Sequence, residues 1–119
     1  MRFNLDTKVD ILGTNYVIRI SDEEDEPRLK GCDGFVDKTT KTIFVHDAVE
    51  DCNLGLPAEH IHKVIRHEVI HAFMFESGLA ENWEHQTFGQ EEMTIDWFAI
   101  QLPKINKVLG HINSELTEM

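Results

Sequence analysis

The N-terminal third of the chain alternates apolar and polar positions with the two-residue period of a β-strand. Residues 8–12 and 16–20 are two such segments, and residues 13–15, Gly-Thr-Asn, have the composition of a tight turn. These segments predict a β-hairpin. An acidic run over residues 21–26 then ends the alternation and is expected to be a solvated loop, and residues 28–31 are expected to form a short helical turn.

A second pair of strand-like segments lies at residues 34–37 and 41–46, joined by the polar residues 38–40. Because side chains alternate across a strand, Ile43 and Val45 share one face of the later segment. These segments predict a second hairpin, whose last strand leads towards a helix.

From residue 58 to about residue 77 the apolar positions recur at the spacing of one face of an α-helix. Pro57 suits the first turn of this helix, and Gly78 suits its C-terminal end. The apolar positions of the predicted helix are Ile61, Val64, Ile65, Val69, Ala72 and Phe75. This face is expected to pack against the sheet that the hairpins form.

A further helix is predicted over residues 90–102. The stripe expected to be buried consists of Ile95, Phe98, Ala99 and Leu102. Pro103 has no backbone N–H and is expected to break or kink this helix, so residues 104–116 are predicted as a last helix, interrupted near Gly110. Together the segments predict a single α+β domain over residues 1–119, in which a small antiparallel or mixed sheet packs on helices.

Charge and hydropathy narrow the classes of function. The formal net charge is −11 at pH 7, and an acidic surface repels phosphate backbones, so nucleic acid is not an expected partner. No apolar run approaches the ~20 residues of a membrane span, and the first residues lack the apolar core of a signal peptide. A cytoplasmic protein with no membrane partner is expected, with Cys32 and Cys52 as free thiols.

The first predicted helix carries the stretch His67-Glu68-Val69-Ile70-His71. Residues four apart lie on one face of a helix, so the imidazoles of His67 and His71 can reach the same metal ion. Imidazole nitrogens are common ligands of tetrahedral Zn²⁺, so one zinc ion is the expected cofactor. Glu68 is the expected catalytic base, which takes a proton from a water held by the metal. The alternative is that two surface histidines fall four residues apart by chance.

Two histidines leave a zinc site without its third protein ligand, which the acidic start of the next predicted helix can supply. Glu92 and Asp96 are four residues apart and therefore share a helix face. Glu92 is the expected ligand, and Asp96 is expected to accept the free ring N–H of a ligand histidine, which fixes its tautomer. Glu91 competes with Glu92 as the ligand. The acidic turn would also stabilise the helix N-terminus without any metal.

An HExxH helix followed by ExxxD on the next helix resembles the gluzincin pattern of thermolysin-like peptidases. The string at residues 91–103, EEMTIDWFAIQLP, is similar to the second signature helix of the ImmA/IrrE metallopeptidases, which are small and mostly from bacteria and phages. Aligning Phe98 and Ala99 with the Phe-Ala pair of that helix puts the ligand glutamate of the family on Glu92. This resemblance covers about residues 33–103.

Residues 11–14 (ILGT), 33–37 (DGFVD) and 67–73 (HEVIHAF) also resemble small zincin-type proteins of prophages, and this likeness extends over most of the chain. These resemblances imply a zincin-like minimal metallopeptidase fold. They further imply action in the cytoplasm of a bacterial host, on a regulatory protein target such as a phage repressor.

The expected activity is hydrolysis of a peptide bond in a protein or peptide substrate. Zincins usually add a donor for the developing oxyanion, and His85 and His46 are the candidates here. The strand over residues 41–46 is expected to border the cleft and to offer an exposed edge for β-addition of a substrate segment. His60 and His62 are expected to face solvent, away from the face of the metal ligands.

Two other functions stay open at this point. A zinc-binding protein-interaction module without catalytic turnover would use the same ligands, although it has no need for a general base at Glu68. Hydrolysis of a non-peptide amide would use the same site and differ only in its substrate.

Overall fold

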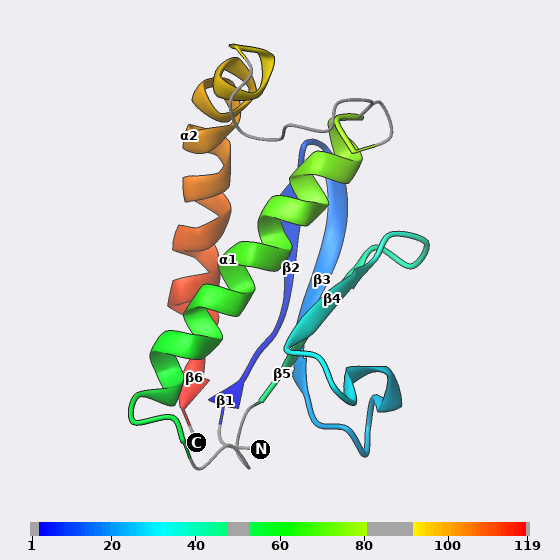
Figure 1. Ribbon diagram of the computed structural model, residues 1–119, viewed down its shortest axis with the longest axis vertical. Helices are drawn as coiled ribbons and strands as arrows, with labels where there is room; N and C mark the ends of the chain where they lie inside the picture. Colours follow the sequence, from blue (N-terminus) through cyan, green and yellow to red (C-terminus); the bar gives the residue numbers. More distant parts are fainter. Residues whose placement is uncertain (1–2, 48–52, 81–91, 119) are drawn as a thin grey trace.

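Two α-helices cover one face of a four-stranded sheet in the part of the chain that the structure describes (Figure 1). The structure is a computed structural model, and it describes residues 3–47, 53–80 and 92–118. In chain order the elements are β1 (Phe3–Asn4), β2 (Asp6–Ile11), β3 (Thr14–Ser21), the 3₁₀ helix η1 (Pro27–Leu29), β4 (Gly34–Asp37), β5 (Thr42–His46), α1 (Pro57–Glu76), α2 (Glu92–Glu115) and β6 (Thr117–Glu118). The expected α+β class, with a small mixed sheet, is confirmed.

The strand order of the main sheet is β2-β3-β5-β4. Both predicted hairpins are confirmed, because β2 pairs antiparallel with β3 and β4 pairs antiparallel with β5. The predicted position of the first turn, residues 13–15, is wrong, since β3 already begins at Thr14. Leu12 and Gly13 connect the first pair with φ angles of 52° and 90°, and two positive φ angles are typical of the tight turns that match the twist of a hairpin. β3 and β5 run parallel, with Ile18 opposite Ile43. A separate antiparallel pair joins β1 to β6.

The expectation of an exposed edge on the strand at residues 41–46 is wrong. β5 lies between β3 and β4, so both of its edges are hydrogen-bonded. Among the described strands, β4 (Gly34–Asp37) pairs only with β5 and forms the edge next to α1. The parallel pairing of β3 with β5 causes this difference, and the hydrophobic period of a strand carries no information about its neighbours.

One face of the sheet and both helices form the core. Five of the six apolar positions predicted for α1 are buried, while Phe75 is half-buried and Phe73 takes its place in the core. The core consists mainly of Val9, Ile11, Tyr16, Ile18, Ile20, Ile43 and Val45 from the sheet, Ile61, Val64, Ile65, Val69, Ala72 and Phe73 from α1, and Ile105, Val108 and Ile112 from α2. The two helices therefore share a single apolar layer with the sheet.

α2 is one continuous helix, so the predicted break at Pro103 and interruption at Gly110 are wrong. Pro103 removes the N–H that would bond to the carbonyl of Ala99, but both residues are exposed, so water can satisfy that carbonyl. On the opposite side of the helix, Ile105 and Val108 are buried and hold the chain in register across the proline. Tertiary packing thus overrides the local preference of proline.

The buried stripe of α2 is also displaced from its predicted position. Ala99 is exposed, Leu102 is 51% exposed and Phe98 is half-buried, while the side chain of Ile95 lies outside the described part of the chain. The buried positions are Gln101, Ile105, Val108 and Ile112. Their spacing of four, three and four residues marks one helix face.

None of the described helices is long and apolar enough to cross a membrane.

Glu76, the last residue of α1, fastens this helix to the sheet. Its Oε1 accepts hydrogen bonds from the hydroxyl of Tyr16 at 2.7 Å and from Nζ of Lys41 at 2.8 Å, and its Oε2 accepts one from Oγ1 of Thr14 at 3.1 Å. A carboxylate at a helix C-terminus is disfavoured by the helix dipole, and the charge of Lys41 offsets this cost. Hydrogen bonds from Lys41 and then from Tyr16 lower the pKa of the Glu76 carboxyl.

Replacing Glu76 with Gln is expected to lower the free energy of unfolding at neutral pH by about 1–2 kcal/mol, because a charged acceptor of three hydrogen bonds is lost. Since the folded pKa of Glu76 is lowered, its contribution is full above the ordinary value of 4.5 and is lost as the pH falls through the folded value. Urea unfolding of both proteins should therefore show a difference that shrinks below about pH 4.

The matched control for this prediction is Glu59→Gln, since Glu59 is an exposed carboxylate in the first turn of the same helix. Its effect should stay within about 0.5 kcal/mol. A difference between Glu76→Gln and the wild type that stays constant from about pH 7 to about pH 3 would contradict this account of the carboxylate.

Candidate metal centre

His67, Glu68 and His71 of α1 bring their ligand atoms within 4.8 Å of one another. The Nε2 atoms of His67 and His71 are 3.0 Å apart, and the two ring planes meet at 69°. Two Zn–N bonds of about 2.05 Å at the tetrahedral angle would separate the nitrogens by about 3.4 Å, which is only about 0.4 Å longer than the observed spacing. The two imidazoles therefore fit two corners of a zinc site.

The electrostatics of the histidine pair also suit a cation. Burial, and then the neighbouring His67, lower the pKa of His71, so its neutral form is favoured. Neutral imidazole is the form that binds metals. Two ring nitrogens at 3.0 Å repel each other through their lone pairs unless a proton or a cation lies between them.

Glu68 lies beside the histidines and is buried. It is 6% exposed, and its Oε1 lies 3.9 Å from Nε2 of His67. Burial raises the pKa of the Glu68 carboxyl, and the nearby His67 opposes this shift. A buried carboxylate with a raised pKa beside two imidazoles is a candidate acid–base group.

β4 passes directly over Glu68 at Gly34. A β-carbon at position 34 would lie 2.8 Å from the carbonyl oxygen of Phe44, 3.0 Å from Cγ1 of Val64 and 3.3 Å from Cγ of Glu68. A glycine is therefore needed for the strand to approach the helix this closely. This role of Gly34 was not predicted from the sequence, although a lone glycine within a strand pattern is a known signal of close backbone approach.

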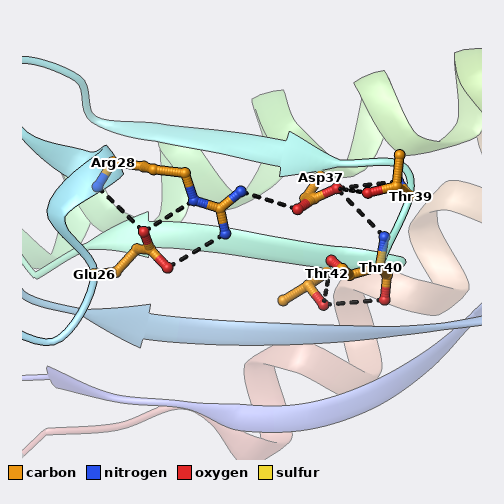
Figure 2. Close-up of polar contacts among 6 residues, drawn as sticks. All are labelled: Glu26, Arg28, Asp37, Thr39, Thr40 and Thr42. Carbon is orange, nitrogen blue, oxygen red and sulfur yellow. Dashed lines mark hydrogen bonds and ion pairs between the residues drawn. The ribbon is translucent and has the colours of Figure 1, made fainter.

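Arg28 of η1 holds β4 from the outer face of the sheet (Figure 2). Its Nη1 donates to Oδ2 of Asp37 at 2.9 Å, and its Nε donates to Oε1 of Glu26 at 2.9 Å. The guanidinium also lies over the stacked rings of Phe35 and Phe44, 4.8 and 5.3 Å from their centroids. These contacts cover the outer side of β4 and β5 and leave the edge of β4 open.

Asp37 ends β4 and organises the turn that follows it (Figure 2). Its Oδ1 accepts hydrogen bonds from the backbone N–H groups of Thr39 at 3.0 Å and Thr40 at 3.3 Å. Hydrogen bonds from Thr39 and then from Arg28 hold the pKa of Asp37 well below its usual range. The turn between β4 and β5 is therefore fixed by side-chain contacts at its start.

A shallow groove of about 640 Å³ follows the free edge of β4. Its lining runs from Cys32, a free thiol, through β4 to Thr39, with Arg28 at one side, while Cys52 lies outside the described residues. The groove shares Gly34 with the close contact to Glu68, but no residue of α1 lines it.

The predicted third ligand is not settled by the described side chains. Glu92 and Asp96 lie in the first turns of α2, but their side chains are outside the described part of the chain, as are Glu91 and His85 altogether. The assignment of Glu92 as a ligand, of Asp96 as a hydrogen-bond acceptor and of Glu91 as the competitor therefore stays a prediction.

A hydrogen bond between two side chains shows how α2 lies relative to α1. Nε1 of Trp97 donates to Oγ of Ser77 at 3.0 Å, so α2 begins near the C-terminal end of α1 and runs back along it (Figure 1). His71 lies six residues before Ser77, or about 9 Å along the helix axis.

His46 lies at the end of β5, and it is not one of the three residues that the structure brings together. Its Nε2 is 3.4 Å from Oε1 of Glu23, and its Nδ1 is 3.4 Å from Oδ1 of Asp47. Neighbouring carboxylates orient this ring, and a donor role towards substrate stays a prediction for His46.

His60 and His62 are both half-buried, and the expectation that they lie away from the face of His67 and His71 is wrong for His60. Seven residues return a helix to within about 20° of the same direction, so His60 shares the face of His67. Its Nε2 lies 3.5 Å from Oδ1 of Asp33, next to the start of β4. His62 lies about 140° around the helix from His67 and is away from the metal centre.

Comparisons with models of protein families, with curated proteins and with solved structures find no match for this chain.

Replacing Gly34 with Ala is expected to lower the free energy of unfolding by about 1–3 kcal/mol, because the new methyl group meets backbone that cannot move aside. Gly110→Ala is the matched control, since a β-carbon there would meet nothing within 4 Å and the position is inside α2. It should stabilise the protein by up to about 1 kcal/mol. Urea unfolding measures both effects, and equal effects of the two substitutions would contradict the close approach at Gly34.

Replacing His71 with Ala is expected to weaken zinc binding by more than about 100-fold, because loss of even an outer hydrogen-bond partner of a ligand costs 10–100-fold. Isothermal titration with zinc checks this, and the wild type should bind one ion. His62→Ala is the control, because His62 lies away from the pair, and it should leave the affinity unchanged. Equal affinities of His71→Ala and the wild type would rule out this centre.

Proposed function

We propose that this chain is a zinc-dependent metallopeptidase with a zincin-like fold. The observation that carries the proposal is the arrangement on α1 of two imidazole nitrogens 3.0 Å apart beside a buried carboxylate with a raised pKa. A purely structural site needs the nitrogens but has no use for an acid–base group next to them.

Each residue of the centre has a definite task in this reaction. His67 and His71 hold the zinc ion, and Glu92 is the proposed third protein ligand. When bound, zinc polarises the substrate carbonyl and makes water acidic enough to be deprotonated near neutral pH. Glu68 takes the proton from the attacking water and delivers it to the nitrogen of the leaving amine as the peptide bond breaks. The burial of Glu68 supports this shuttle, because it favours the protonated form after the first step.

The substrate is proposed to be an extended protein segment that adds to the free edge of β4. Unpaired backbone groups of an edge strand bind such a segment through main-chain hydrogen bonds. The shallow groove along β4 and the contact of Gly34 with Glu68 support this placement, because a segment on this edge would pass the buried carboxylate. The ImmA/IrrE resemblance favours a regulatory protein target, such as a phage repressor, in a bacterial cytoplasm.

A zinc-binding interaction module without turnover is the second candidate. The carboxylate of Glu68 belongs to the same group of atoms within 4.8 Å as the two imidazole nitrogens. Glu68 could therefore be the third ligand itself, in which case the centre would have no base. The two functions make opposite predictions for a variant that removes only the charge of Glu68.

Glu68→Gln is expected to keep zinc affinity within about threefold of the wild type and to lower peptide hydrolysis by about 10²–10⁴-fold, the usual contribution of a general base. The measurement compares zinc-loaded wild type and variant in bacterial cell extract, with new protein N-termini identified by mass spectrometry. Glu59→Gln, on the exposed face of the same helix, is the control and should cleave like the wild type.

Two results would overturn the peptidase proposal. If the same N-termini appear with Glu68→Gln as with the wild type, Glu68 is not the base. If Glu68→Gln loses zinc to the same extent as His71→Ala, Glu68 is a ligand and the interaction module is the better account.

A further inference from the structure

Another cavity lies between β2 and α2, away from the metal centre. Its volume is about 710 Å³, within the range of small-molecule sites. Leu12, Phe73 and Val108 contribute apolar surface to it. Phe73 is two residues after His71, or about 200° around α1, so the cavity and the histidine pair are on opposite sides of this helix.

The polar lining of this cavity is mostly cationic. Lys104, Lys107 and His111 line it from α2, at a spacing that places them on one helix face, and Lys8 lines it from β2. This grouping is unexpected in a protein with 11 lysines and arginines and a formal net charge of −11. Among the described residues of the lining, Asp10 is the one acidic residue.

Within the described residues, the three lysines of the cavity form no ion pair, whereas other cations of the sheet are neutralised locally. Arg19 pairs with Asp6 at 3.4 Å, and Lys41 pairs with Glu76 at 2.8 Å. The carboxylate of Asp10 accepts a hydrogen bond from the backbone of Gly13 at 2.6 Å, which holds it at the β2–β3 turn. Three lysines line the cavity beside the one carboxylate of Asp10, so the described lining carries a net positive charge.

The position of the cationic groups relative to the apolar surface is fixed by the fold. Nε2 of His111 is hydrogen-bonded to Oγ1 of Thr7 at 3.1 Å, and this contact ties α2 to β2 beside the cavity. Val108 is 7% exposed and Phe73 is 1% exposed, so the apolar part of the lining belongs to the core. A site with apolar walls and a few charged groups is suited to a ligand that has an apolar part and a charged part.

We propose that the cavity between β2 and α2 binds an amphipathic anion, a small molecule with an apolar body and a carboxylate or phosphate head. The apolar body contacts Leu12, Phe73 and Val108, and the head lies beside Lys104 and Lys107. A bound anion relieves the mutual repulsion of the lysines, which an uncharged molecule of the same shape cannot do.

Four eight-carbon probes test this site by titration with NMR detection of backbone amides. Octanoate and octyl phosphate carry the proposed heads, 1-octanol is neutral, and octyltrimethylammonium is cationic. The anions are expected to shift the amides of Leu12, Phe73 and Val108 and to bind at least about tenfold more tightly than 1-octanol. Their affinity should fall as salt is added. The tighter of the two anions identifies the preferred head.

The lysines are tested with the double variant Lys104→Gln/Lys107→Gln, expected to bind octanoate about tenfold more weakly than the wild type. Lys30→Gln/Lys63→Gln is the matched control, because both lysines are exposed and lie outside the lining. It should bind octanoate like the wild type. Exposed lysine-to-glutamine changes keep helix propensity, so the amide spectrum of each variant should retain the native dispersion.

Three results would contradict the proposed site. The first is that neither anion binds at concentrations up to about 10 mM. The others are equal affinity for octanoate and 1-octanol, or an equal loss of octanoate affinity in the two double variants. Shifts confined to the residues around His67 and His71 would also overturn it, because the anion would then be bound at the metal centre. The titrations are run with and without zinc so that this outcome is visible.

Discussion

The close contact between β4 and α1 at Gly34 is the constraint on which the candidate active site depends. It places Glu68 under an edge strand, where burial raises the pKa of its carboxyl, and it leaves the outer edge of β4 open beside that carboxyl. If β4 lay further from α1 by the width of a side chain, water would reach Glu68 and the pKa of its carboxyl would be ordinary. Arg28 on the outer face and Glu76 at the end of α1 hold the two elements in this relation.

α1 has to satisfy two demands along its length. Ile65, Val69 and Ala72 bury one face in the core, while His67 and His71 remain exposed on another. Glu68 lies at the border between these faces, and its burial costs desolvation energy that a structural helix would avoid. A buried carboxylate that costs stability is a feature expected of a functional site, and the proposed role of Glu68 as the base would account for it.

Local features could be predicted from the sequence, and features set by distant contacts could not. The hairpins and the helix of the HExxH stretch follow from periods and turn residues within a few positions of each other. The parallel pairing of β3 with β5 joins segments separated by η1 and β4, and no local pattern indicates it. α2 continues through Pro103 because the packing of Ile105 and Val108 outweighs the lost hydrogen bond. The pairing of His67 with His71 was predictable from spacing alone, whereas the contact of Gly34 with Glu68 required the position of a strand.

The central claim is that His67 and His71 share one zinc ion while Glu68 stays unbound and acts as the base. It is tested most directly by diffraction from zinc-soaked crystals, measured on both sides of the zinc absorption edge. The predicted result is one anomalous peak about 2.1 Å from Nε2 of each histidine, with both oxygens of Glu68 more than about 3 Å away. A map without a peak between the two imidazoles, or with Glu68 bound directly to the metal, would contradict it.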